Sequence, residues 1–131
     1  MAERKEYIVS DDELKKLCDE WQGRLRLQAW DIDASICRAS EFVLPDCCGE
    51  NEWNHQNNKS EIRILDHVDF PKTKFPQDME VALVHELLHL CFESFEPKNK
   101  ESLRFDLMER TIERLANVLV ELKRERDNNA D

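Results

Sequence analysis

The chain has 131 residues, and 29 acidic against 19 basic side chains give it a formal net charge of −10. This acidic balance disfavours nucleic acids and anionic membranes as partners, because both attract clustered basic residues. The length predicts one domain over 1–131, with flexible ends at 1–9 and 127–131. No apolar run approaches the roughly 20 residues that cross a bilayer, and the N-terminus lacks the apolar core of a signal peptide, so we expect a cytoplasmic protein.

The N-terminal part of the chain predicts a helix and a strand. Ser10 and Glu13 have the spacing of a capping box. Apolar residues then recur at helical spacing and predict a helix over 11–27. From 30 to 37, apolar and polar residues alternate, which is typical of a half-buried strand.

The middle of the chain predicts the rest of a small mixed sheet. Residues 44–51 carry turn chemistry, and a second strand is expected to begin near Trp53. Residues 61–65 form the third predicted strand, paired with the second in a hairpin. A loop with two prolines is expected over 66–76.

The C-terminal part predicts two helices. The segment 77–93 is apolar on nearly every face, so this helix is expected to be buried. A connector at 97–100 leads to a long helix over 101–126. Apolar residues recur along it at steps of three to five: Leu103, Leu107, Ile112, Leu115, Leu119 and Leu122. Together these elements predict an α/β (α+β) domain.

The five cysteines are odd in number and irregularly spaced, so we expect free thiols rather than a disulfide framework. The adjacent Cys47 and Cys48 lack the spacer of structural zinc sites. We interpret them as a loop pair, with metal binding or redox sensing as the alternative. Cys91 is expected to fill the core.

The buried helix carries the main motif, His85-Glu86-Leu87-Leu88-His89. Histidines four residues apart project from one face of a helix, so both can bind one zinc ion. Glu86 can then take a proton from a water bound to that ion, because zinc lowers the pKa of such a water to about 7. The alternative is a pair of core histidines that bind no metal.

No histidine follows His89, so a third ligand from downstream would be a carboxylate. Glu109 lies on the apolar flank of the last helix, beside Ile112, and Glu113 lies one turn further. Both are therefore candidates for a metal site. The alternative is that both lie at the rim of the core and pair with neighbouring arginines.

The histidine pair followed by Glu109-Arg110-Thr111-Ile112-Glu113 resembles the gluzincin zinc metallopeptidases. The small size is similar to the minigluzincins and to compact metallopeptidases of phages and prophages. The resemblance implies a zincin-like fold: an N-terminal helix, a small mixed sheet, an active-site helix and a glutamate helix. It also implies one Zn²⁺ held by His85, His89 and Glu109, with Glu113 orienting a ligand histidine. The activity it implies is hydrolysis of a peptide or protein substrate, with the glutamate of the motif as general base.

The resemblance leaves some roles open. The segment from Glu113 to Asn117 also resembles the ligand helix of phage-repressor-cleaving peptidases, in which Glu113 would bind zinc in place of Glu109. Thermolysin-like enzymes supply a histidine or tyrosine after the ligand glutamate to stabilise the oxyanion, and this chain has neither there. The second hypothesis is therefore a zinc-binding regulatory or interaction module with little peptidase activity.

Three further expectations concern the surroundings of the site. In the family, an edge strand binds the substrate backbone, and 61–65 is the candidate here. His55 or His67 would have to approach from loops to stabilise an oxyanion. The N-terminal segment of some minigluzincins occupies the cleft; Glu3 or Glu6 could do so here, and a disordered terminus is the alternative we favour.

Overall fold

In the computed structural model, which describes residues 5–72 and 75–129, helix α1 (Asp11–Arg24) begins at the predicted capping box. The Ser10 hydroxyl accepts a hydrogen bond from the backbone N–H of Glu13 at 3.2 Å, and the Glu13 carboxylate accepts one from the N–H of Ser10 at 3.1 Å. The helix ends before the predicted Leu27, because Arg26 takes a left-handed backbone conformation with φ of 60°. The residues that α1 buries are Leu14, Cys18 and Trp21.

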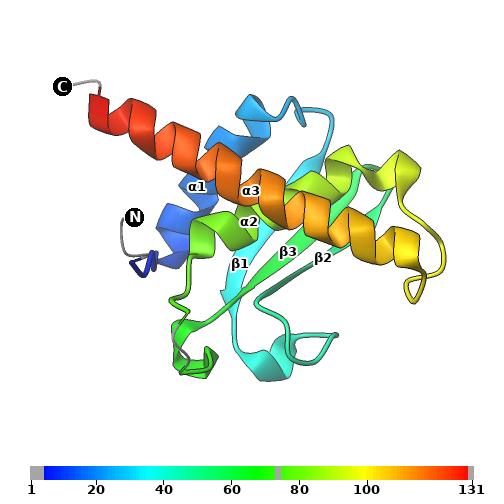
Figure 1. Cartoon of the computed structure of the whole chain (residues 1–131), viewed down its shortest axis with the longest axis horizontal. Coiled ribbons are helices and arrows are strands. Elements are labelled where there is room, and N and C mark those ends of the chain that lie inside the picture. The colour runs from blue at the N-terminus through cyan, green and yellow to red at the C-terminus, as the bar shows by residue number, and fades with distance from the viewer. Residues whose placement is uncertain (1–4, 73–74, 130–131) are drawn as a thin grey trace.

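Three strands form one mixed sheet in the described part of the chain (Figure 1). They are β1 (Asp31–Cys37), β2 (Gly49–Asn54) and β3 (Lys59–Leu65). Strand β3 lies in the centre, parallel to β1 and antiparallel to β2. The predicted hairpin of the second and third strands is therefore confirmed.

Two predictions about this sheet were wrong. The turn expected over 44–51 is shorter, because β2 already begins at Gly49. The segment 61–65, expected at the edge, belongs to the central strand, and β2 is the edge strand that contacts α2.

Glu50 of β2 is polar yet buried, because its carboxylate pairs with the guanidinium of Arg63 on the neighbouring strand.

Helix α2 (Met79–Cys91) lies between the sheet and helix α3 (Leu103–Asn129) and contacts both (Figure 1). Asp78 caps its N-terminus, since the carboxylate accepts a hydrogen bond from the N–H of Val81 at 3.1 Å. The predicted burial of this helix is confirmed. Its buried residues are Met79, Glu80, Leu83, Val84, Glu86, Leu87, Leu88, His89 and Leu90.

Helix α3 buries a narrower face than its leucine repeat suggests. Its buried residues are Ile112, Ala116 and Val120, and its exposed apolar residues are Leu103, Leu107, Leu115, Val118 and Leu122. The helix packs on α2 along one side, so a single stripe of residues suffices to close the core. Cys91, expected to fill the core, is exposed because it is the last residue of α2, beyond the buried turns.

The N-terminal segment pairs with the residues that precede α2. The N–H of Tyr7 donates a hydrogen bond to the carbonyl oxygen of Gln77 at 2.9 Å. Of the flexible ends predicted at 1–9 and 127–131, residues 1–4 and 130–131 lie outside the described residues, as does the role suggested for Glu3. In the described part, Tyr7 is paired in this way and helix α3 continues to Asn129.

All five cysteines are free, as predicted. Among the described residues, no helix combines the length and the apolarity that crossing a bilayer requires.

Candidate metal centre

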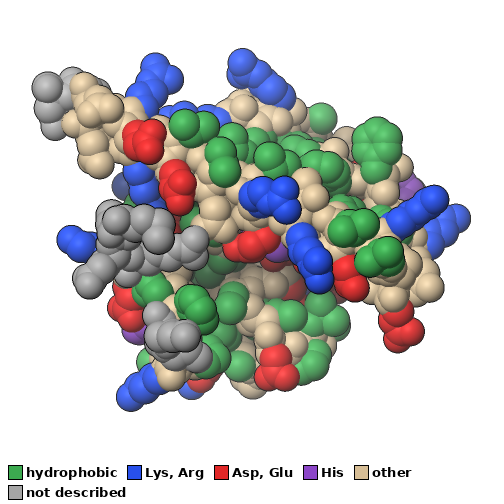
Figure 2. All heavy atoms as spheres, viewed as in Figure 1, with side chains coloured by type: hydrophobic (Ala, Val, Ile, Leu, Met, Phe, Trp, Pro, Cys, Tyr) green, Lys and Arg blue, Asp and Glu red, His purple; other side chains and the backbone are tan. Residues whose placement is uncertain are grey.

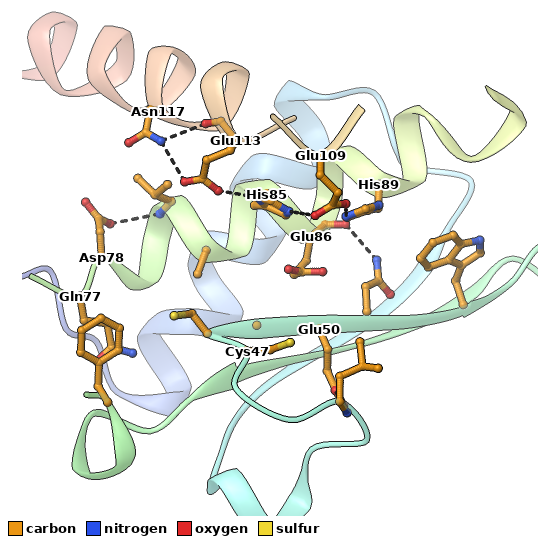
Figure 3. Close-up of a pocket in the computed structure, with 18 of the residues that line it drawn as sticks. Cys47, Glu50, Gln77, Asp78, His85, Glu86, His89, Glu109, Glu113 and Asn117 are labelled. Carbon is orange, nitrogen blue, oxygen red and sulfur yellow. Dashed lines mark hydrogen bonds and ion pairs between the residues drawn. The ribbon is translucent and has the colours of Figure 1, made fainter. Parts of the chain in front are cut away.

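Helix α2 turns the two motif histidines toward α3. Because His85 and His89 are four residues apart, their rings lie one helical turn apart on the same face, with centroids separated by 5.3 Å. Glu109 reaches them from α3 (Figure 3). Its Oε1 lies 2.7 Å from Nε2 of His89, and its Oε2 lies 3.4 Å from Nε2 of His85. The three residues could hold a metal ion, since one ligand atom of each lies within 4.8 Å of the others.

The contact between Glu109 and His89 is close, but it is not a hydrogen bond. Oε1 of Glu109 is buried and has no hydrogen-bond partner among the described residues, although Nε2 of His89 is 2.7 Å away. A buried carboxylate oxygen that has an ionic partner but no hydrogen bond still bears part of the cost of its burial. A cation placed between this oxygen and the two imidazole nitrogens would remove that cost, and two histidines with one glutamate are an established ligand set of zinc. The residues present therefore fit a metal ion.

Each histidine is held by a carboxylate at its other ring nitrogen. Nδ1 of His85 lies 2.6 Å from the carboxylate of Glu113, and Nδ1 of His89 lies 3.2 Å from that of Glu96. Glu113 is held in turn by the side-chain amide of Asn117, which donates to its Oε1 at 3.0 Å. These contacts favour the tautomer that carries its proton on Nδ1 and directs the lone pair of Nε2 toward the shared point.

The geometry distinguishes the two glutamates considered as the third ligand. Glu109 faces the Nε2 atoms of both histidines, whereas Glu113 contacts Nδ1 of His85. A ligand has to share the point on which the Nε2 lone pairs converge. This arrangement favours Glu109 as the ligand and Glu113 as the residue that orients His85.

Glu96 is the functional candidate that sequence reasoning missed. It follows the short 3₁₀ turn Glu93–Phe95 after α2, and no periodic pattern places it near a histidine. The available signal was a carboxylate seven residues after His89. In a chain with 29 acidic residues that signal is too common to single it out.

Glu86 points from α2 toward strand β2, on the other side of the helix from Glu113 (Figure 3). It is 8% exposed. A side chain at position 49 would press on it, since a Cβ added to Gly49 would lie 3.3 Å from Oε2 of Glu86. Asn51 fixes the same turn of helix by donating a hydrogen bond from Nδ2 to the carbonyl oxygen of Glu86 at 3.0 Å.

The pKa of Glu86 suits proton transfer near neutral pH. Burial raises this pKa to about 7, against the opposing effect of the two positively charged histidines. A carboxyl group with such a pKa can accept a proton and return it within one reaction.

The ligand cluster is held together by opposite charges. Burial by itself lowers the pKa of His85, but the carboxylates of Glu109 and Glu113 outweigh burial and raise this pKa to about 10. The pKa of His89 is also raised, because Glu109 and Glu86 outweigh its burial. In return, the two imidazoles lower the pKa of Glu109 to about 2. A metal ion would therefore have to displace protons from the histidines, which makes its binding dependent on pH.

The cluster lies in a cleft of about 560 Å³. Figure 2 shows a hollow on this face of the molecule, beneath α3. Residues from β2, from the loop before it, from α2 and from α3 line the cleft, and Cys47 and Cys48 are among them. Trp53 of β2 also lines it, and its ring stacks on that of His89 with centroids 5.9 Å apart.

The other residues considered for the site lie elsewhere. Among the described residues that line the cleft there is no His55, His67 or Glu6. Nδ1 of His67 lies 2.9 Å from Oε1 of Gln77, and its Nε2 lies 3.7 Å from a carboxylate oxygen of Glu6. His67 therefore contacts Gln77 and Glu6 of the N-terminal segment and is not part of the candidate metal centre.

In comparisons with known proteins, the chain matches no family model, no curated protein and no solved structure.

Proposed function

We propose that this protein hydrolyses peptide bonds with one zinc ion held by His85, His89 and Glu109. The observation that carries the proposal is the convergence of two Nε2 atoms and one carboxylate on a shared point, in a cleft that also holds the buried carboxylate of Glu86. When bound, zinc supplies a Lewis acid that activates water and polarises a carbonyl group.

Glu86 acts as the proton carrier of the reaction. It accepts a proton from the attacking water and then delivers it to the amine nitrogen as the peptide bond breaks. Gly49 leaves room for its carboxylate, and Asn51 holds its helical turn in place. Glu113 and Glu96 keep the two histidines in the tautomer that leaves Nε2 free for the metal.

Strand β2 is the element best placed to bind the substrate. It pairs with β3 along one side, and it lies at the edge of the sheet beside α2. An extended peptide adds to such an edge through its main chain. The substrate proposed here is therefore a peptide or an extended segment of a protein.

The test measures zinc content and peptide hydrolysis in three variants. Glu86→Gln is expected to bind zinc as the wild type does and to lose hydrolysis by a factor of about 10² to 10⁴, since glutamine cannot accept the proton. Glu109→Ala is expected to lose zinc, because one of three ligands is gone. Glu101→Gln, an exposed glutamate outside the cleft lining, is the matched control and keeps both. Full hydrolysis by Glu86→Gln would contradict the proposal.

One observation favours a second function, a zinc-binding regulatory or interaction module. Among the described residues that line the cleft, the only histidines are the two ligands, and there is no tyrosine. The usual partners of an oxyanion are thus missing. Incubation of zinc-loaded protein with casein, with and without a chelator, separates the two functions. Chelator-sensitive cleavage supports the peptidase, and inactivity at stoichiometric zinc supports the module.

A further inference from the structure

The exposed face of α3 carries a row of three apolar residues and one threonine that lies outside the buried core of the chain. Thr111, Leu115, Val118 and Leu122 follow one another at steps of four, three and four residues and lie within about 60° of one another around an α-helix. Leu115, Val118 and Leu122 are 36%, 45% and 56% exposed. Figure 2 shows hydrophobic side chains along this helix, with basic side chains beside them. We name the four residues the α3 seam.

The spacing of the α3 seam is that of a helix that packs against another helix. A surface helix without a partner typically carries polar residues at such positions. The seam also faces away from the metal centre, because Glu109 and Glu113 project from the opposite side of α3 toward α2. A partner on the seam would therefore leave the cleft open.

The seam is complementary to itself when the helix is reversed. If two copies of α3 run antiparallel about a twofold axis between Leu115 and Val118, Leu115 of one copy lies opposite Val118 of the other. Thr111 then lies opposite Leu122. The seam thus meets a second copy of itself, with the apolar Leu115 and Val118 at the centre and Thr111 against Leu122 at each end, as an interface with twofold symmetry requires.

The charges that flank the seam complement one another in the same arrangement. Arg110 and Arg114 lie along one edge of the seam in its N-terminal half, and Glu121 and Glu125 continue that edge in its C-terminal half. Each of the four is exposed, and none forms an ion pair with another described residue. In the antiparallel pair, Arg114 lies beside Glu121 of the second copy and Arg110 beside Glu125 of the second copy. Symmetry doubles both contacts.

We propose that the α3 seam binds a second copy of this chain, with the two α3 helices antiparallel about a twofold axis. The net charge of −10 opposes association of two copies. The complementary edges of the seam offset that repulsion locally and select the antiparallel orientation over the parallel one.

The first test is sedimentation velocity of the full chain over a concentration series. The wild type is expected to form a dimer. Val118→Glu is expected to weaken it at least tenfold, because a buried unpaired carboxylate replaces an apolar contact at the centre of the interface. Val68→Glu, the same change at an exposed position outside α3, is the matched control and leaves the dimer intact. A monomer up to about millimolar concentration overturns the proposal.

The second test exchanges charges and does not disturb the apolar seam. Arg110→Glu with Arg114→Glu makes the whole edge acidic, and Glu121→Arg with Glu125→Arg makes it basic. Each double variant alone is expected to dimerise at least tenfold more weakly than the wild type. The four changes combined in one chain restore the homodimer. A dimer that none of these variants alters uses another surface and overturns the proposal, and thermal melts by circular dichroism confirm that each variant is folded.

Discussion

Replacement of Glu96 probes a carboxylate contact of the candidate metal centre that no sequence pattern marks. Its Oε1 lies 3.2 Å from Nδ1 of His89, and the side chains of Glu96 and His89 are 17% and 10% exposed. This contact holds the ring in the tautomer whose Nε2 is free for a metal. Glu96→Gln keeps an oxygen that can accept the hydrogen bond and removes the charge, whereas Glu96→Ala removes both.

The geometry sets the expected loss of zinc affinity. A hydrogen bond to a charged partner contributes about 1.5–3 kcal/mol, and a neutral one contributes about 1 kcal/mol. Because both side chains are largely shielded from water, screening removes little of this difference. Glu96→Gln is therefore expected to weaken zinc binding roughly two- to thirtyfold, and Glu96→Ala roughly ten- to a hundredfold.

The assay is competition for zinc with a chromophoric chelator at neutral pH. Glu93→Gln is the matched control, because Glu93 begins the turn that leads to Glu96 and is not among the partners of His85 or His89. Circular dichroism shows whether each variant is folded before titration. Wild-type zinc affinity in Glu96→Ala would refute the reasoning that this carboxylate orients the histidine.

Two further predictions concern pH and the space around Glu86. In the metal-free protein, the raised pKa of His85, about 10 against 6.5 unfolded, stabilises the fold fully below pH 6.5, and this stability is lost as pH rises through 10. The melting temperature of the metal-free protein should therefore fall over that range. The rise in melting temperature that zinc causes should become larger over the same range. Gly49→Val is expected to keep zinc and to lose about a hundredfold in hydrolysis, because the new side chain displaces the Glu86 carboxylate.

Each of these two predictions has a clear contrary result. Differential scanning fluorimetry from pH 6 to 10, with and without zinc, would contradict the first if the metal-free melting temperature rose with pH. Gly23→Val is the control for the second, since a Cβ at Gly23 meets no atom within 4 Å. Equal hydrolysis by the Gly49 and Gly23 variants would show that Glu86 does not need the space at position 49.

Local features of the chain were readable from the sequence because they depend on neighbours within a few residues. The capping box formed by Ser10 and Glu13 starts α1 as predicted. The histidine spacing in α2 puts both rings on one face whatever surrounds the helix. The position of Glu109 beside Ile112 placed its carboxylate on the side of α3 that meets α2.

Features that depend on which elements pack together could not be predicted from the sequence. Apolar and polar residues alternate over 59–65, as they do in edge strands and in central strands. Only the pairing of β1 and β2 on its two sides makes this strand a central one. The leucines of α3 have the spacing of a core stripe, yet Leu115 and Leu122 face outward because α2 occupies a different side of the helix. Glu50 is buried in β2 because Arg63 neutralises it across the sheet.

The sequence by itself determined the helices, the strands, the histidine pair and the glutamate between them, because periodicity and caps are properties of a short stretch of chain. The tertiary structure decided that Glu109 meets Nε2, that Glu113 and Glu96 hold Nδ1, and that β2 forms the edge beside the cleft. Those contacts join segments whose relative positions follow from the packing of the whole core. A metal site needs directed contacts from several elements at once, and such directions exist only after the chain has folded.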